Sequence, residues 1–201
     1  MIVLLTGATG NLGPAVRTAF ERNGHTVASV SREGAWAADL TKSGEADRIV
    51  EKILGEHRRL DVLAHGLGGF SAGNVAGTTD ETWDQMIGLN LNAAFYAIRA
   101  ALRPMLAQGT GRIIAVGSRA GVLPAPGIAA YNVSKAGLNA LVQSVALEVK
   151  GTDVTANAVL PSVIDRDKGV APEAIADCML WLASEAAASV NGALIPLYGK
   201  A

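Results

Sequence analysis

Short apolar runs alternate along the chain with longer stretches in which apolar and polar positions recur at helical spacing. The apolar runs predict strands at residues 2–5, 26–30, 61–64, 112–116, 155–159 and 193–197. The periodic stretches predict helices at residues 12–23, 45–56, 80–107, 130–149 and 172–184. Several strands are apolar on both faces, as in a parallel sheet that is covered on both sides. The alternation therefore predicts an α/β fold with a doubly wound parallel sheet.

The chain shows no internal repeat, low-complexity tract or linker, so we expect a single domain over residues 1–201. The residues at the expected starts and ends of the helices agree with these elements. Thr79 or Asp80 can cap the third predicted helix, and Pro172 stands where a first helical turn tolerates proline. We expect Pro104 to kink or end the third helix, because proline lacks the N–H that a helix interior uses.

The composition indicates a folded protein and narrows its class. Half of the 201 residues are hydrophobic, which excludes a disordered chain. Lys and Arg number 17 and Asp and Glu 18, so the net charge of -1 argues against a nucleic-acid binder. The single cysteine, Cys178, excludes an internal disulfide and a cysteine-based zinc site. His, Asp and Glu show no metal-ligand spacing, so we expect no metal.

The sequence also shows no membrane-spanning stretch and no secretory signal peptide. No apolar stretch reaches the roughly 20 residues that a membrane-spanning helix needs. The apolar N-terminus has no basic segment and leads directly into a glycine-rich turn, so we interpret it as a buried strand. We therefore expect a cytoplasmic protein without a membrane partner.

A glycine-rich turn follows the first predicted strand and opens the first predicted helix. Its sequence, Thr-Gly-Ala-Thr-Gly-Asn-Leu-Gly at residues 6–13, has the context of the dinucleotide fingerprint of Rossmann-like folds. Glycines permit close approach of the backbone to a pyrophosphate, and the helix N-terminus offers free N–H groups. A generic turn is the alternative, but the position after the first strand favours phosphate binding. The candidate contacts are Gly7, Thr9, Gly10, Asn11, Leu12 and Gly13.

The end of the second predicted strand bears on the choice of dinucleotide. Ser31 and Arg32 stand there, followed by Glu33. An acidic residue at this strand end would bind a ribose 2′-hydroxyl, whereas a hydroxyl and a guanidinium suit a 2′-phosphate. The residues thus favour NADP(H) over NAD(H). NAD(H) stays open, because Arg32 can be solvated and Glu33 can turn inward.

Tyr131, Lys135 and Ser118 form the candidate reactive set. Tyr131 and Lys135 are four residues apart on a predicted helix and so share a face. An unperturbed phenol titrates at about pH 10, but a nearby ammonium lowers its pKa. Ser118 follows a strand at the carboxyl edge of the sheet, where ligands bind. A Tyr-x-x-x-Lys pair alone is better explained as an ordinary pair on a helix surface. Its coincidence with the glycine turn and Ser118 favours a site in which Ser118 holds a substrate carbonyl beside the Tyr131 phenol.

With these features the chain resembles a short-chain dehydrogenase/reductase of the classical type over nearly its whole length. The matching features are the glycine turn, Asp39-Leu40, Asp61-Val62-Leu63, Asn90, Ser118, Tyr131 with Lys135, Asn157-Ala158-Val159-Leu160-Pro161 and Asn191-Gly192-Ala193. The resemblance implies an NAD(P)H-dependent oxidoreductase that transfers hydride between nicotinamide and a carbonyl or alcohol substrate.

The resemblance also implies catalytic roles. Tyr131 would be the general acid or base, and Ser118 would orient the carbonyl. Lys135 would lower the pKa of Tyr131 and hold the nicotinamide ribose. Asn90 would hold a water that relays protons to Lys135.

Further residues would contact the cofactor or a second copy of the chain. Asp39 and Leu40 would contact the adenine, and Pro161, Val163 and Ile164 would flank the nicotinamide. The family implies a homodimer or homotetramer. Its members associate through the helices that carry Asn90 and Tyr131, and through the last helix and strand.

Several residues depart from the family pattern. Asn11 stands where the family type has glycine, and Arg166 stands where a Thr would contact the carboxamide, so that contact is not carried over. His65 and Gly66 replace the start of an Asn-Asn-Ala-Gly segment and remain candidate cofactor contacts. His65 would tie neighbouring strands or border the cofactor, with catalysis as the less favoured alternative.

The chain is also short for this family, and the missing length falls in two places. Only residues 33–38 separate Arg32 from Asp39, fewer than the roughly 10–12 that a βαβ crossover needs. The third family strand would therefore reduce to residues 36–40. Likewise, only residues 166–170 join Asp165 to the last predicted helix, which begins at Pro172. The family has small helices here that close over the substrate, so we expect no such lid and an open site.

Two alternatives to a carbonyl reductase or alcohol dehydrogenase stay open. Residues 66–70 and 160–165 faintly resemble dihydropteridine reductase, which reduces a quinonoid pterin, although Ser118 argues against this. The two shortened segments also suit a dinucleotide-binding module that senses the cofactor without turnover.

Overall fold

Six parallel strands form one sheet in the computed structural model, which describes residues 1–199. The strands are β1 (Ile2–Thr6), β2 (Thr26–Val30), β3 (Val62–His65), β4 (Thr110–Val116), β5 (Asp153–Pro161) and β6 (Leu194–Leu197). Their order is β2-β1-β3-β4-β5-β6. The chain moves outward from β1 to β2 and then returns to β3 on the other side of β1. This reversal makes the carboxyl ends of β1 and β3 the switch point at which such sheets bind ligands.

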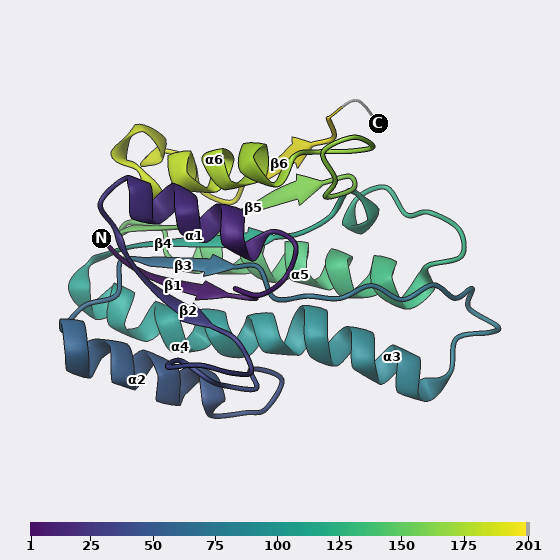
Figure 1. Ribbon diagram of the computed structural model, residues 1–201, viewed down its shortest axis with the longest axis horizontal. Helices are drawn as coiled ribbons and strands as arrows, with labels where there is room; N and C mark the ends of the chain where they lie inside the picture. The colour runs from purple at the N-terminus through teal and green to yellow at the C-terminus, as the bar shows by residue number, and fades with distance from the viewer. Residues whose placement is uncertain (200–201) are drawn as a thin grey trace.

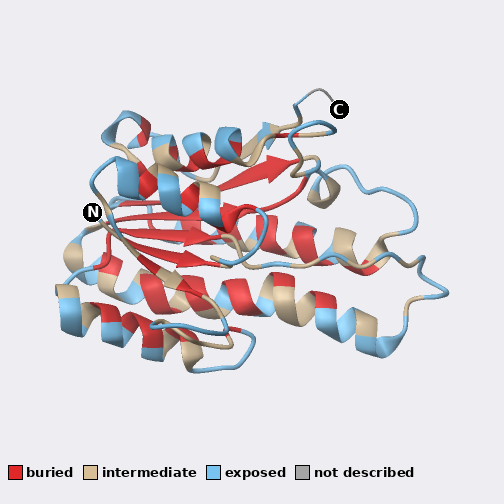
Figure 2. Cartoon of the chain, viewed as in Figure 1, coloured by how far each residue is buried: buried red, intermediate tan, exposed pale blue. Residues whose placement is uncertain are grey.

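Helices cover both faces of the sheet, which confirms the predicted doubly wound α/β fold (Figure 1). One face carries α1 (Gly13–Arg22) and α6 (Pro172–Ala183), and the other carries α2 (Glu45–His57), α4 (Ala93–Gln108) and α5 (Ala129–Glu148). Two apolar clusters fill the spaces between the sheet and these helices. Figure 2 shows the central strands of the sheet buried while the helices expose their outer faces. None of the helices described is long and apolar enough to cross a membrane.

The long third helix is not regular throughout, contrary to the prediction. It consists of α3 (Asp80–Ile87), a π-helical turn at Gly88–Asn92, and α4. Thr79 caps α3 as expected, because its Oγ1 accepts a hydrogen bond of 3.2 Å from the Thr82 N–H. Pro104 does not end α4, which continues to Gln108. The buried face of α4 packs on the sheet through Ala101 and Met105, on either side of the proline.

The predicted short strand at residues 36–40 is wrong. Only one bridge, between Ser31 and Ala37, forms beside β2, and the chain then passes through a loop into α2. Side chains of α2 fasten this loop instead of a strand ladder: the Arg48 guanidinium donates to the Ala37 carbonyl at 2.7 Å. The Lys52 ammonium donates to the Ala35 carbonyl at 2.8 Å. Too few residues remain here for a full crossover, so β2 is the edge of the sheet.

The second shortened segment joins β5 to α6. Residues 162–171 contain no helix, and one bridge between Ile164 and Val170 closes the segment into a compact loop. This agrees with the expectation that the small helices above the substrate are absent. The carboxyl edge of the sheet is therefore left open beside β5.

Candidate active site

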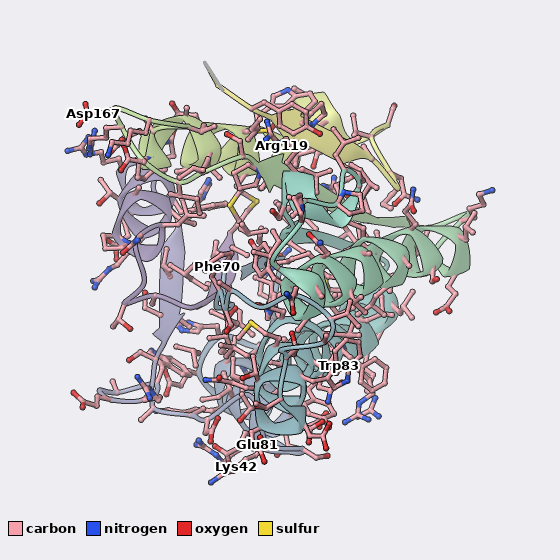
Figure 3. The ribbon with its side chains drawn as sticks, turned by 90° about the vertical axis from the view of Figure 1, so that its right-hand side faces the viewer. Lys42, Phe70, Glu81, Trp83, Arg119 and Asp167 are labelled. Atoms are coloured by element: carbon pink, nitrogen blue, oxygen red, sulfur yellow. The ribbon has the colours of Figure 1, made fainter. Side chains whose placement is uncertain are left out.

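A cleft runs along the carboxyl edge of the sheet, the edge that faces the viewer in Figure 3. It consists of two adjoining cavities that share Gly7, Gly10, Gly66 and Gly68. The cavity beside β2, called here the β2-side cavity, has a volume of about 870 Å³. The β4-side cavity, between the ends of β4 and β5, has a volume of about 600 Å³. A ligand that spans both cavities must pass over the glycine turn.

Close backbone contacts explain the glycines of this turn. Gly7 has a φ of +71°, and a Cβ there would lie 2.7 Å from the backbone of Gly66. A Cβ at Gly13 would lie 2.2 Å from the carbonyl oxygen of Ala8. The turn therefore packs against the loop after β3 and against the start of α1 with no room for side chains. The N-terminus of α1 carries no side-chain cap and no acidic residue in its first turn, so it can attract an anion.

The β2-side cavity contains the residues proposed for the adenosine end of a dinucleotide. Arg32 is exposed on its wall. The Ser31 hydroxyl donates to the Glu33 carbonyl at 2.6 Å and also accepts from the Glu33 N–H, so these residues form a tight turn. Asp39 accepts a hydrogen bond of 2.6 Å from the Thr41 hydroxyl, which lowers the pKa of the Asp39 carboxyl. Asp39 is thus a fixed acceptor on the cavity wall.

The β4-side cavity brings together Ser118, Tyr131 and Lys135. Lys135 is buried and donates to the Val116 carbonyl at 2.7 Å, and burial lowers its pKa to about 8. Burial raises the pKa of the Tyr131 phenol, and the Ser118 hydroxyl partly offsets this. The expected lowering by Lys135 is not seen, because the ammonium is directed at the end of β4. In this state the phenol keeps its proton at neutral pH.

Asn90 supports this cavity from below and does not line it. It is fully buried in the π-helical turn. Its side-chain amide donates to the Gly69 carbonyl at 3.1 Å and to the Ser134 hydroxyl at 3.0 Å, and its Oδ1 accepts from the Gly69 N–H. A Cβ at Gly68 would lie 2.8 Å from Asn90 Oδ1 and 3.3 Å from Lys135 Nζ. Asn90 therefore fixes the loop after β3 directly over Lys135.

His65 ties neighbouring strands, which was one of the two favoured expectations. Its Nδ1 lies 2.9 Å from the Thr6 hydroxyl across the β1–β3 pair. The ring is fully buried and lines neither cavity, so this geometry gives it no contact with the cleft, and its place beside the cofactor stays a prediction. Burial lowers the pKa of His65 to about 3, and the ring is neutral under ordinary conditions.

Most other residues expected from the sequence line the cleft. Thr9, Ser31, Arg32, Asp39 and Leu40 line the β2-side cavity, and Asn11, Leu12, Pro161, Val163 and Ile164 line the β4-side cavity. Gly13 acts through packing of the turn.

The sequence analysis missed Phe70 and Arg119, which both line the β4-side cavity. Phe70 packs edge to face against the Tyr131 ring, with 5.1 Å between ring centroids. Phe70 ends the segment at residues 66–70 and Arg119 follows Ser118 directly, and this proximity was the available signal. Within residues 1–199, no group of three or more His, Cys, Asp and Glu side chains is placed to hold a metal ion.

Comparison with known proteins gives a consistent family assignment. The family model described as short chain dehydrogenase matches residues 1–170. The uncharacterized oxidoreductase YvrD of Bacillus subtilis (strain 168) is 36% identical over 177 residues, 80% of this chain and 67% of that protein. The 3-oxoacyl-(acyl-carrier-protein) reductase MabA of Mycobacterium bovis is 30% identical over 225 residues, 98% of this chain and 91% of that protein. Since that alignment exceeds 201 residues, this chain lacks internal segments that MabA has.

A solved structure agrees in fold. The structure of ElxO with NADP bound has a TM-score of 0.92 and 21% identity, and the match covers 98% of this chain and 96% of that chain. At this identity the likeness is one of fold alone.

The buried His65 ring predicts a specific loss of stability in acid. Its pKa is about 3 in the folded protein against 6.5 ordinarily, so below pH 6.5 the unfolded chain binds a proton that the folded protein does not. Stability is full above pH 6.5 and falls toward pH 3, by about 1.4 kcal/mol for each pH unit. His65→Asn removes this contribution. When unfolding by urea is measured between pH 7 and pH 4.5, the unfolding free energy of His65→Asn should therefore fall less steeply with falling pH than that of the wild type.

The matched control is His57→Asn at the end of α2, which should keep the wild-type slope. Equal slopes for His65→Asn and the wild type would contradict the assignment of a neutral, buried His65.

Proposed function

The chain belongs to the short-chain dehydrogenase family, and on this premise we propose that it reduces carbonyl compounds, or oxidises the corresponding alcohols, with Tyr131 as general acid or base. Family membership supports an oxidoreductase, and the proposal adds its dependence on a nicotinamide dinucleotide. The observation that carries the finer proposal is the convergence of Ser118, Tyr131 and Lys135 on a cavity that adjoins the glycine turn. The printed name of MabA, a reductase of a 3-oxoacyl group, supports a carbonyl substrate.

A nicotinamide dinucleotide fits the residues present. The cradle formed by Gly7 and Gly13 excludes side chains, and the uncapped start of α1 lies beside it. We assign the pyrophosphate to this turn, which comprises Gly7, Thr9, Gly10, Asn11, Leu12 and Gly13. Asp39 and Leu40 would hold the adenine, and Pro161, Val163 and Ile164 would hold the nicotinamide, with Gly66 between the two ends. When bound, the cofactor supplies or accepts the hydride.

Ser118 and Tyr131 of the β4-side cavity would have different roles in the reaction. The Ser118 hydroxyl would donate a hydrogen bond to the carbonyl oxygen and orient it. The Tyr131 phenol would then transfer its proton to that oxygen as hydride reaches the carbonyl carbon, and in the reverse direction the phenolate would accept the proton. A raised pKa suits Tyr131 as the acid, because the phenol stays protonated until charge develops on the substrate oxygen.

Lys135 and Asn90 would support the Tyr131 phenolate once it forms. At neutral pH the Lys135 ammonium carries its charge, since its pKa is about 8, and a positive charge in a buried site stabilises a nearby anion. It would also hold the nicotinamide ribose. Asn90 would keep the loop after β3 in place above Lys135 and border a proton relay to it. We therefore assign Asn90, Ser118, Tyr131 and Lys135 as the catalytic set.

Arg32 and Ser31 favour NADP(H) over NAD(H). Arg32 is exposed on the β2-side cavity wall, and Ser31 lies beside it. A guanidinium pairs well with a phosphate because both partners offer two contacts in one plane. Glu33 does not line the cavity, and its backbone is tied to the Ser31 hydroxyl. A 2′-phosphate would therefore meet a positive charge at this wall.

We also propose a single domain over residues 1–201, a homodimer or homotetramer, and a cytoplasmic location. Exposed apolar side chains on α4 and α5 support self-association, among them Phe95, Leu106 and Leu147.

Tyr131→Phe tests the proton-transfer role. The variant removes the hydroxyl and leaves the ring that packs against Phe70, so we expect NADPH-dependent reduction of aldehydes to fall by about 10²- to 10⁴-fold in kcat. NADPH affinity should change little. Turnover is followed by the absorbance of the reduced nicotinamide. Tyr96→Phe, on α4 outside both cavities, is the matched control. Wild-type turnover by Tyr131→Phe would overturn the mechanism.

Arg32→Ala tests the choice of cofactor. Loss of a charge-assisted contact should raise KM for NADPH by about 10- to 100-fold and leave KM for NADH nearly unchanged. Lys42→Ala removes a positive charge from the same loop but not from the cavity wall, and it should shift KM for NADPH far less. If Arg32→Ala affects the two cofactors equally, Arg32 does not bind the 2′-phosphate.

A further inference from the structure

We propose that Arg119 binds an anionic group on the substrate, so that the preferred substrates are carbonyl compounds with an apolar body and a carboxylate or phosphate. This inference rests on the proposed function and names its substrate class. Lys135 is already assigned to the phenolate and the ribose, whereas Arg119 has no part in that chemistry.

The backbone of Arg119 is held firmly next to Ser118. Arg119 begins a 3-10 turn, Arg119–Gly121, in which the Ser118 hydroxyl accepts a hydrogen bond of 3.2 Å from the Ala120 N–H. A Cβ at Gly121 would lie 2.8 Å from the carbonyl group of Lys135, so the turn packs directly on α5. The side chain of Arg119 therefore starts from a fixed point at the reactive end of the cavity.

The Arg119 guanidinium has N–H groups that pair with no carboxylate in the described part of the chain. It lies over the Tyr198 ring at 5.7 Å from the ring centroid. A guanidinium stacked on a ring keeps its N–H groups free at its edge. No carboxylate in the described part of the chain pairs with it, whereas Arg112 pairs with Glu185 and Arg166 pairs with Glu173. Arg119 is thus oriented by an aromatic contact, and within residues 1–199 its guanidinium donates no side-chain hydrogen bond.

The charges around the two cavities differ in sign. Asp39 and Asp84 line the β2-side cavity together with Arg32. The lining of the β4-side cavity includes no acidic residue, and its two charged side chains are Arg119 and Lys135. A cavity lined by charges of one sign favours a ligand of the opposite sign. An anionic substrate is therefore attracted to the end at which the carbonyl must react.

Apolar side chains supply the rest of the wall. Phe70 and Leu123 line the same cavity and are 64% and 59% exposed. Phe70 belongs to the loop after β3 and Arg119 to the turn after β4, and both lie at the edge turned toward the viewer in Figure 3. Without a lid, these side chains provide the apolar surface available to a substrate. The matching ligand has an apolar body between a carbonyl at Tyr131 and an anion at Arg119.

A matched set of aldehydes tests the proposal in the full-length protein with NADPH. The set consists of 4-carboxybenzaldehyde, 4-formylphenyl phosphate and the neutral methyl 4-formylbenzoate. We expect kcat/KM to be higher for at least one anionic aldehyde than for the ester. Arg119→Gln should lower kcat/KM for that aldehyde by about 10- to 100-fold and leave the ester within about twofold. The larger effect among the two anions identifies carboxylate or phosphate as the preferred group.

Two controls separate charge from structure. Arg119→Lys should recover part of the anion preference, because it restores the charge without the planar donors. Arg17→Gln, on the exposed face of α1, should change neither rate. If Arg119→Gln lowers the rates for the ester and the anions equally, Arg119 acts on the structure of the site and the proposal is wrong.

A binding measurement distinguishes failure of this proposal from failure of the proposed function. Calorimetry with 4-(hydroxymethyl)benzoate and its methyl ester, on protein saturated with NADPH, involves no possible turnover because both partners are reduced. Weaker binding of the carboxylate alone in Arg119→Gln supports the anion site even if no aldehyde is reduced, which would overturn only the reductase activity. Reduction of the aldehydes without any charge preference in rates or binding would overturn the anion site and leave the reductase activity standing.

Discussion

The hydrogen bond from the buried Lys135 ammonium to the Val116 carbonyl is the contact on which the site depends. A charged group out of water is costly unless it is paired, and this bond joins the middle of α5 to the end of β4. It fixes Tyr131 one helical turn away, and it fixes Ser118 two residues beyond Val116. Gly68 and Gly121 close around Lys135 at distances that exclude any side chain. The same contact thus assembles the reactive groups, while the burial of Lys135 lowers its pKa to about 8.

The chain omits two segments without disturbing this contact. The loop that stands in place of the expected third strand lies beside β2 at the edge of the sheet, and the loop that stands in place of the expected lid follows β5. Neither segment touches the β4–α5 junction. The loop after β2 still places Asp39 and Leu40 on a cavity wall, because Arg48 and Lys52 fasten it to α2. The shortened chain therefore keeps the reactive geometry and loses enclosure, and Phe70 and Arg119 stay on the open wall of the β4-side cavity, where we propose that they contact a substrate.

The sequence predicted the features that depend on residues close together along the chain. The six strands followed from apolar runs, the glycine turn from its context after β1, and the placement of Tyr131 and Lys135 on one cavity from helical spacing. Contacts between distant segments determined the rest. The π-helical turn accompanies the bonds of Asn90 to Gly69 and Ser134, and the loop after β2 depends on side chains of α2. Arg119 and Phe70 are exposed loop residues, so no periodicity marks them.

The central claim is that this cleft delivers hydride from a nicotinamide to a carbonyl carbon held beside Tyr131. The most direct measurement uses NADPH deuterated at the transferred position of C4, with methyl 4-formylbenzoate as a neutral aldehyde, and determines the mass of the alcohol formed. The account predicts an alcohol with one deuterium on the carbinol carbon. An alcohol without deuterium, or no alcohol from any aldehyde in the set despite binding of NADPH, would contradict it.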